Sequence, residues 1–249
     1  MLTEQQDAFG RQLYDYLLAK TEARTSGLIE RNDGFIADSG SSAHYFSDFK
    51  GWSLLERKAI RFARGRVLDA GCGAGRHLLY LQQKGHEVVG IDNSPLAIEV
   101  CKKRGVENAV VLPLSAIHSG MGEFDTVLML GHNFGLFGSF KGARRILKKL
   151  KSITSKRARI IATTNNPYEK KDTDNLDYHR YNREHGRMGG QLRLKVRYRK
   201  YATPWFDYLM VSREEMETIL ENTGWKVSRF IDTEDSHFAA IIEKEKVRK

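Results

Sequence analysis

The chain has 249 residues, of which 41% are hydrophobic and 10% aromatic, and this composition excludes a globally disordered protein. Lys and Arg total 41 against 31 Asp and Glu, which gives a formal net charge of +10. Such an excess attracts nucleic acid, anionic lipid or acidic substrates, although part of it lies in residues 243–249, where charge is more often solvated.

Membrane and metal functions are not indicated. No apolar run approaches the ~20 residues needed to cross a bilayer, and the N-terminus lacks the apolar stretch of a signal peptide. The two cysteines, Cys72 and Cys101, cannot form a metal cluster alone, and their spacing matches no zinc motif. We therefore expect a cytoplasmic, reduced protein with no metal site and no membrane partner.

The first 50 residues are expected to form a helical cap or lid. Thr3 and Gln6 fit a capping box, and apolar residues at helical spacing predict a helix over residues 4–20. Residues 31–52 are rich in Gly, Ser and Asp, which predicts a loop with short turns. A second helix over residues 53–64 leads into the main domain, which we place at residues 51–249.

From residue 66 the sequence alternates apolar strands with helices. Ser94 and Pro95 fit the N-cap and first position of one helix, and another is predicted from Ser139 to Ser152. Alternation of this kind predicts a parallel, doubly wound sheet. The predicted strands occupy residues 66–71, 87–92, 109–112, 124–130 and 159–164.

The pattern changes after residue 164. Residues 191–201 alternate apolar and basic side chains, and residues 205–211 predict a partner strand, so we take residues 165–211 as a β-rich insertion that covers the site. Ser212 and Glu215 cap a final helix, and residues 225–243 predict an antiparallel hairpin at the sheet edge. The expected fold is α/β, with a doubly wound, mostly parallel seven-stranded sheet, an antiparallel C-terminal hairpin, a helical N-terminal cap and the insertion.

The basic residues of the insertion form a row with three interpretations. The side chains of Arg193, Lys195, Arg197 and Arg199 are expected to leave one face of one strand. The row protects an exposed sheet edge, or pairs with carboxylates, or binds phosphates. His179 and His185, also in the insertion, are expected to be exposed polar histidines.

A glycine-rich turn follows the first strand of the main domain. Asp69 lies near the strand end, and Gly71, Gly73 and Gly75 precede the next helix. Glycine permits positive φ and a close ligand approach, and the helix N-terminus offers free N–H groups to a carboxylate. The dinucleotide fingerprint GxGxxG is not met, because Arg76 stands where it requires glycine. Asp69 would accept from an ammonium group and repel a pyrophosphate.

Asp92 ends the next predicted strand, at the sheet edge where ligands of open α/β folds bind. A carboxylate there can accept hydrogen bonds from both hydroxyls of a ribose. Outside such a site it would be a solvated strand end. We expect the replacement of Asp92 by alanine to weaken ligand binding with little loss of folding stability.

The segments VLDAGCGAGRH (67–77) and VVGIDNSPLAIEVCKKRG (88–105) resemble class I S-adenosylmethionine-dependent methyltransferases. The resemblance covers about residues 67–164 and the terminal helix and hairpin, and it implies S-adenosyl-L-methionine as cofactor. Serine at the first adenine position departs from the acid that the family often has there. The implied cofactor residues, from the methionine end through the ribose to the adenine and then the methyl donor, are Asp69, Gly71, Cys72, Gly73, Asp92, Asn93, Ser94, Ser115, Ala116 and Leu130.

The resemblance implies direct displacement at the sulfonium methyl, with S-adenosyl-L-homocysteine as product. Such a reaction needs orientation and exclusion of water more than acid–base chemistry. His132 follows the fourth predicted strand and is the candidate catalytic base, since its reference pKa of about 6.5 suits that role. The alternative is an enzyme that positions its acceptor and needs no base.

We expect a methyltransferase that acts on a small molecule. One alternative is an RNA or DNA methyltransferase, such as a tRNA or rRNA enzyme, that uses the basic strand. Another is a cofactor-binding regulatory protein that performs no methylation. The residues that bind the methionine part of the cofactor do not themselves carry out methyl transfer, so their presence does not exclude this alternative. The fold does not choose the acceptor, and the sequence leaves the acceptor and the oligomeric state open.

Overall fold

The computed structural model describes residues 2–19, 25–169, 172–233 and 236–245. No helix in these ranges is long and apolar enough to span a membrane. The α-helices are α1 (Ala8–Ala19), α2 (Ala43–Phe46), α3 (Leu54–Ala59), α4 (Arg76–Gln83), α5 (Pro95–Lys103), α6 (Phe140–Ser152), α7 (Thr173–Glu184) and α8 (Arg213–Leu220). Short 3₁₀ turns are η1 (Glu4–Gln6), η2 (Phe49–Gly51), η3 (Ile60–Phe62), η4 (Leu114–Ala116), η5 (Ser119–Met121) and η6 (Asn133–Phe137).

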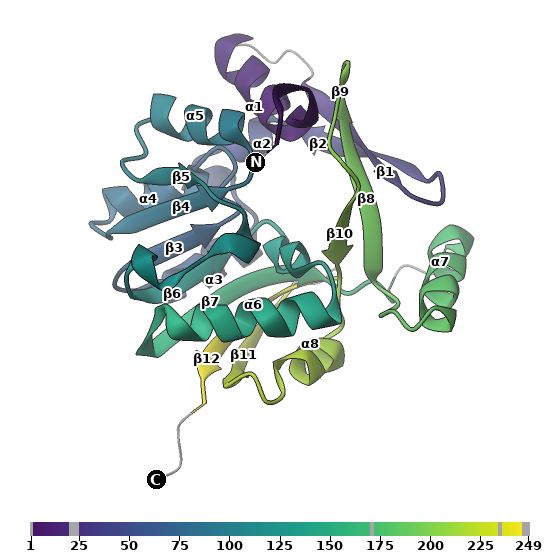
Figure 1. The fold of residues 1–249 in the computed structure, drawn as a ribbon. Helices are drawn as coiled ribbons and strands as arrows, with labels where there is room; N and C mark the ends of the chain where they lie inside the picture. Colours follow the sequence, from purple (N-terminus) through teal and green to yellow (C-terminus); the bar gives the residue numbers. More distant parts are fainter. Residues whose placement is uncertain (1, 20–24, 170–171, 234–235, 246–249) are drawn as a thin grey trace. The chain divides into compact units, whose positions relative to one another are not determined.

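The strands form two sheets, and the larger one has the expected seven strands, in the order β11-β12-β7-β6-β3-β4-β5 (Figure 1). The smaller sheet has the order β10-β8-β1-β2, with β9 paired to β8. The strands are β1 (Ser26–Arg31), β2 (Ile36–Ser41), β3 (Val67–Ala70), β4 (Val88–Asp92), β5 (Ala109–Val111), β6 (Phe124–Met129), β7 (Thr154–Asn165), β8 (Gln191–Tyr198), β9 (Tyr201–Ala202), β10 (Phe206–Leu209), β11 (Trp225–Asp232) and β12 (His237–Lys244).

The chain divides into two compact units. The first contains residues 1–52, 68–116 and 193–206, and the second contains residues 53–67, 117–192 and 207–249. In the first unit β4 and β5 run parallel, with Gly90 opposite Ala109, and every residue of β3 is buried. Strands buried on both faces are typical of a parallel sheet covered by helices, so the alternation of the sequence predicted β3, β4 and β5 of this unit.

The second unit holds the other end of the larger sheet. β6 and β7 are parallel, whereas β12 pairs antiparallel with both β7 and β11. α6 buries Ala143, Ile146, Leu147 and Leu150 along one stripe, as its helical spacing predicted. The antiparallel C-terminal hairpin is therefore confirmed, and β11 is one of the two edge strands of the larger sheet.

The predicted helix boundaries hold where a local cap decides them. Ser94, Ser139 and Ser212 each accept a hydrogen bond from the backbone N–H three residues later, and Glu215 completes the capping box of α8. The N-terminal helix differs, because the capping box of Thr3 belongs to η1 and α1 begins only after Asp7. Lys20, the predicted last residue, lies outside the described residues.

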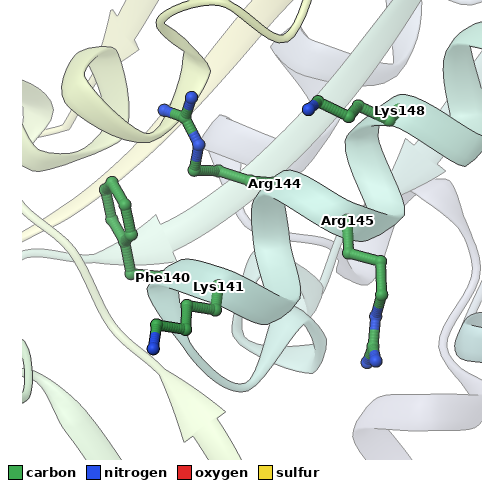
Figure 2. Close-up of a pocket in the computed structure, with 5 residues that line it drawn as sticks. All are labelled: Phe140, Lys141, Arg144, Arg145 and Lys148. Carbon is green, nitrogen blue, oxygen red and sulfur yellow. The ribbon is translucent and has the colours of Figure 1, made fainter.

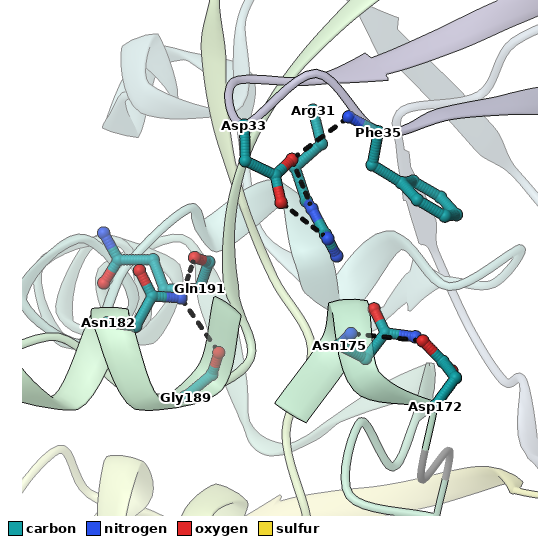
Figure 3. A network of polar contacts seen from close by, with 8 residues as sticks. All are labelled: Arg31, Asp33, Phe35, Asp172, Asn175, Asn182, Gly189 and Gln191. Carbon is teal, nitrogen blue, oxygen red and sulfur yellow. Dashed lines mark hydrogen bonds and ion pairs between the residues drawn. The ribbon is translucent and has the colours of Figure 1, made fainter. Parts of the chain in front are cut away.

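The loop predicted over residues 31–52 is wrong in its first half, because β1 and β2 form an antiparallel hairpin there. β2 exposes most of its side chains, so it lacks the apolar alternation that marks a strand in sequence. Asp33 stabilises the turn (Figure 3), since its carboxylate accepts from Arg31 Nε at 2.9 Å and from the Phe35 N–H at 3.3 Å. The first 50 residues are thus not only helical.

The polar start of the insertion contains a helix, α7, that the sequence analysis did not place. Asp172 caps it through the Asn175 N–H at 3.1 Å. Asn182, which is fully buried, donates to the backbone oxygens of Gly189 at 2.9 Å and Gln191 at 2.8 Å (Figure 3). One amide therefore holds the end of α7 against the start of β8.

Candidate functional site

The glycine turn between β3 and α4 has the conformation that its sequence demands. Gly71, Gly73 and Gly75 have φ of 78°, 53° and 77°, all in the left-handed region that favours glycine. The Gly71 N–H donates to the Ile91 oxygen at 2.8 Å, so the turn is held against the end of β4. The predicted methionine-end residues and Asp92 are therefore neighbours within the first unit.

Asp69 is a buried carboxylate, and one of its two oxygens lacks a hydrogen-bond partner among the described residues. Its side chain is 1% exposed, and Oδ2 has no hydrogen-bond partner in the described part of the chain. Burial, and then the nearby charge of Asp92, raise the pKa of Asp69 to about 7, while Arg76 opposes the shift. An unsatisfied buried oxygen beside a glycine turn is suited to a cationic ligand group.

Asp92 is buried and not a solvated strand end. Its Oδ2 accepts from the Gly73 N–H and its Oδ1 from the Ser94 N–H, both at 3.0 Å. Burial raises the pKa of Asp92, the two backbone N–H groups oppose this, and Asp7 adds to it. Each oxygen keeps a second lone pair for a ligand hydroxyl. Two buried N–H groups depend on this carboxylate, so its contacts favour a cost in folding stability over the small effect expected from the sequence.

Asp7 belongs to the same cluster, and the sequence analysis missed it. The side chain is 1% exposed and accepts from the Gly10 N–H at 3.0 Å and from the Leu96 N–H at 2.9 Å, at the start of α5. Asp7 therefore joins the start of α1 to the start of α5. Three buried carboxylates, those of Asp7, Asp69 and Asp92, give this part of the unit a negative potential that disfavours a pyrophosphate.

Aromatic side chains from the N-terminal residues lie over the glycine turn. A Cβ built on Gly73 would lie 3.8 Å from the Phe9 ring and 4.0 Å from the Tyr45 ring. The two rings pack edge to face, with their centroids 5.1 Å apart. The N-terminal residues thus lie against one wall of the turn.

Two arginines hold this covering in place, and no sequence signal marked that role. Arg76 donates to the His44 oxygen at 3.2 Å and lies 5.6 Å from the Trp52 ring. Arg104, on the turn after α5, donates to the Tyr45 and Phe46 oxygens at 3.3 Å and to the Ala74 oxygen. Arg76, whose position breaks the dinucleotide fingerprint, is a buried structural cation.

The other predicted cofactor residues occupy four places. Asn93 and Ser94 follow β4, and Cys72 is a buried free thiol whose Sγ lies 3.9 Å from Cys101 Sγ. Ser115 and Ala116 form the exposed end of η4 in the first unit. Leu130 is buried in the second unit, directly after β6.

His132 lies after β6 in a strained conformation, with φ of 65°. Its N–H donates to Thr163 Oγ1 at 2.8 Å, and its oxygen accepts from the Tyr208 hydroxyl at 2.6 Å. Its ring lies 4.7 Å from the ring of His237. Strain maintained by surrounding contacts is common at functional sites, and these contacts fix the backbone of the candidate base.

The basic row of the insertion is paired within the first unit. β8 lies between β10 and β1, so it is not an edge strand. Arg197 forms an ion pair with Glu30, and Lys195 lies 4.3 Å from the Trp205 ring. Arg199 lies in the turn after β8 and pairs with Asp15 at 3.0 Å. Edge protection is therefore wrong, and carboxylate pairing accounts for two of the four cations.

The histidines of the insertion differ from each other. His185 is exposed, as expected, but His179 is only 4% exposed. The His179 ring packs edge to face on Tyr168 at 5.2 Å. The prediction of an exposed His179 is wrong. α7 buries one of its faces, although the polar residues of this segment give no sign of a buried face in the sequence.

α6 presents a basic hollow of about 500 Å³ in the second unit (Figure 2). Its thirteen residues include six Lys or Arg and no acid. No group of three or more metal-binding side chains occurs in the ranges that the structure describes. The residues that line the hollow are Phe140, Lys141, Arg144, Arg145 and Lys148.

Curated relatives match part of the chain. It is 40% identical over 81 residues to the 2-heptyl-1-hydroxyquinolin-4(1H)-one methyltransferase of Mycobacteroides abscessus, which covers 30% of this chain and 34% of that protein. It is 32% identical over 114 residues to an S-adenosyl-L-methionine-dependent Diels-Alderase of Talaromyces variabilis, which covers 39% of this chain and 36% of that protein. The chain thus spans about a third of the length of these relatives.

Solved structures match much more of the chain. A methyltransferase from Bacteroides fragilis, solved with S-adenosyl-L-homocysteine, matches with a TM-score of 0.83 and 25% identity over 98% of this chain and 97% of that one. The CcbJ methyltransferase of Streptomyces caelestis has a TM-score of 0.60 and 13% identity over 80% of this chain and 93% of that one, which shows the fold alone.

A family model described as a methyltransferase domain matches residues 67–156. That range contains the glycine turn, Asp69, Asp92 and His132. The whole-chain likeness to a structure that binds S-adenosyl-L-homocysteine agrees with this match and with the buried acids around the turn. Residues 67–156 therefore match a methyltransferase domain, and the chain as a whole is similar in fold to S-adenosylmethionine-dependent methyltransferases.

Proposed function

We propose that this protein transfers the methyl group of S-adenosyl-L-methionine to a small molecule. The observation that best supports S-adenosyl-L-methionine as the cofactor is the buried Oδ2 of Asp69, which has no hydrogen-bond partner among the described residues and lies beside the glycine turn. The small-molecule half is supported by the Mycobacteroides relative, whose name gives a quinolinone as its substrate. We take residues 1–50 as a cap and residues 165–211 as an insertion that together cover the site.

The residues around the glycine turn fit the cofactor chemically. Asp69 would accept from the methionine ammonium, and the first N–H groups of α4 would face its carboxylate. Asp92 would accept the ribose hydroxyls through its free lone pairs. In this proposal the remaining contacts come from Gly71, Cys72, Gly73, Asn93, Ser94, Ser115, Ala116 and Leu130.

The bound cofactor supplies an electrophilic methyl group on a sulfonium. The contribution of the protein is to hold the acceptor in line and to exclude water. We place His132 on the acceptor side, where its imidazole would take the proton that the acceptor loses. Its fixed backbone makes it a rigid base.

Transfer of labelled methyl groups tests this function. The full chain would be incubated with labelled S-adenosyl-L-methionine and either 2-heptyl-1-hydroxyquinolin-4(1H)-one with other ring hydroxyl compounds, or tRNA. We expect label in the small-molecule fraction. Label in tRNA alone would replace the proposal with the nucleic-acid alternative, and cofactor binding without transfer to either fraction would favour a non-catalytic protein.

Asp92→Ala should weaken cofactor binding tens- to hundreds-fold. Two hydrogen bonds to a charged acceptor are lost, which together cost about 2–4 kcal/mol of binding free energy. Folding stability should also fall, by about 1–3 kcal/mol, because the Gly73 and Ser94 N–H groups lose their acceptor. Calorimetry with S-adenosyl-L-homocysteine and denaturant unfolding measure the two effects, with Asp38→Ala on exposed β2 as the control. An unchanged dissociation constant would remove Asp92 from the site.

A nucleic-acid acceptor is the second candidate, and the basic hollow of α6 favours it. Four cations facing one hollow would release counterions on binding phosphates. This candidate predicts a log–log salt slope of about −3 for tRNA, which falls close to zero when Lys141, Arg144, Arg145 and Lys148 become Ser. The matched control changes the exposed cations Lys58, Arg61, Lys102 and Lys103. An equal slope in both variants would eliminate the hollow as a phosphate site.

A further inference from the structure

The two cysteines of the chain lie side by side in the first unit. Cys72 stands in the glycine turn and Cys101 on α5, 29 positions later. Both are free thiols, and Cys72 is 7% exposed whereas Cys101 is fully buried. Their Sγ atoms are 3.9 Å apart, a distance that leaves no room for another atom between them. The fold therefore brings the only two thiols of the sequence into direct contact.

The thiol pair is joined to the glycine turn by hydrogen bonds. The Cys72 N–H donates to the Ile91 oxygen at 3.1 Å, which holds Cys72 against the end of β4. The Cys101 thiol donates to the Gly73 oxygen at 3.1 Å, and the N–H of the same glycine donates to Asp92 at 3.0 Å. A change at either sulfur therefore acts directly on the backbone of the turn.

Glycines make the space in which the two sulfurs meet. A Cβ added to Gly90 would lie 3.0 Å from Cys72 Sγ, and one added to Gly75 would lie 2.9 Å from Cys101 Sγ. Each sulfur thus fills the volume that a side chain would need at the neighbouring glycine. Glycine at both positions admits the thiol pair, and this packing keeps the two sulfurs in contact.

We propose that Cys72 and Cys101 form a reversible disulfide bond when a hydroperoxide reacts with the cofactor-free chain, and that this bond weakens cofactor binding. The inference rests on the proposed function, because it takes Cys72 as a cofactor contact. A disulfide holds its sulfurs about 2 Å apart, so oxidation draws the glycine turn toward α5. It also removes the thiol hydrogen that bonds to the Gly73 oxygen.

The oxidation proceeds in two steps, and Cys72 reacts first because it is the more exposed thiol. Its sulfur forms a bond to one peroxide oxygen as the oxygen–oxygen bond breaks, and the thiol proton leaves with the other oxygen as an alcohol or water. The Cys101 sulfur then forms a bond to the Cys72 sulfur, and the hydroxyl leaves with the Cys101 proton as water. The two sulfurs lose two electrons, which reduce the peroxide.

Treatment of the full chain with hydrogen peroxide tests the bond. The reaction is run at alkaline pH, because the hydrogen bond with Cys101 and burial raise the pKa of the Cys72 thiol. Mass spectrometry after alkylation of the denatured chain should show the loss of two hydrogens and a linked pair of peptides that contain Cys72 and Cys101. Calorimetry should show that the affinity for S-adenosyl-L-homocysteine falls at least about tenfold, and dithiothreitol should restore it.

Cys101→Ser is the matched variant, since serine keeps a donor for the Gly73 oxygen and lacks the second sulfur. Before oxidation it should bind S-adenosyl-L-homocysteine like the parent. After peroxide treatment it should carry an added oxygen on Cys72 and no disulfide. In the parent, S-adenosyl-L-homocysteine at about ten times its dissociation constant should slow disulfide formation about tenfold, because only the unoccupied chains react.

Three results would overturn the inference. They are oxygen added to the thiols of the parent without a disulfide between them, an oxidised chain that binds S-adenosyl-L-homocysteine as tightly as the reduced chain, and equal rates of oxidation with and without this ligand. Binding by the reduced parent is measured first. If the reduced parent does not bind S-adenosyl-L-homocysteine, the proposed function fails, whereas the mass of the oxidised chain still shows whether the two thiols form a bond.

Discussion

The affinity of the chain for S-adenosyl-L-methionine should fall about tenfold for each pH unit below 7, because only ionised Asp69 can pair with the ligand ammonium. Burial and the charge of Asp92 raise the pKa of Asp69 to about 7 in the folded chain. At pH 6 about a tenth of the molecules are therefore competent to bind, and at pH 5 about a hundredth. Calorimetry from pH 5.5 to 7 measures this slope below the titration of the ligand amine.

Asp69→Asn is the decisive variant. It removes the charge with little change in shape, so we expect an affinity loss of about a hundredfold at pH 7 and no remaining pH dependence. Asp38→Asn, the same change at an exposed position, should behave like the parent. A flat pH profile in the parent, or an Asn variant that binds as tightly, would contradict the role of Asp69.

The titration of Asp69 also changes folding stability. Cofactor binding favours the ionised carboxylate, whereas folding favours the protonated form. The pKa of Asp69 is higher in the folded chain than in the unfolded chain, so protonation favours the folded state. The stability that this group contributes is therefore complete at acid pH and is lost as the pH rises from about 4 to 7. Ligand-free protein should become less stable over this range, whereas bound cofactor should offset the loss.

His132→Asn should lower kcat by about a hundredfold or more, since general bases typically contribute factors of 10² to 10⁴. Asparagine tolerates the left-handed backbone at φ of 65°, so this change removes the imidazole without adding strain. Formation of S-adenosyl-L-homocysteine with a hydroxyl acceptor gives kcat, and calorimetry should show unchanged cofactor affinity.

His185→Asn is the matched control for the His132 variant, because His185 is exposed at the end of α7. It should leave kcat unchanged. A kcat within twofold of the parent in His132→Asn would show that the protein positions its acceptor and uses no base at this residue.

Local signals account for what the sequence predicted well. Glycines at positive φ, serine caps and runs of apolar residues act over a few positions, so β3, β4, α5, α6 and α8 could be placed from their own residues. The glycine turn and Asp92 could be brought together for the same reason, since both follow strands of one parallel sheet.

Long-range contacts account for what the sequence did not reveal. Asp7 is a site residue only because its carboxylate reaches the Leu96 N–H, 89 positions away. Asn165 is buried by its pairing with β12, which is far along the chain. The β1–β2 hairpin was taken as a loop because exposed Gly, Ser and Asp carry no alternation, and its stability comes from pairing with β8.

Calorimetry of the unmodified chain with three ligands tests the central claim most directly. Three buried carboxylates around the glycine turn should accept S-adenosyl-L-methionine and S-adenosyl-L-homocysteine, which carry an ammonium group, and reject NAD, which carries a pyrophosphate. We predict saturable binding of the first two at pH 7 and no heat from NAD. Tight binding of NAD with no response to S-adenosyl-L-methionine would contradict the account.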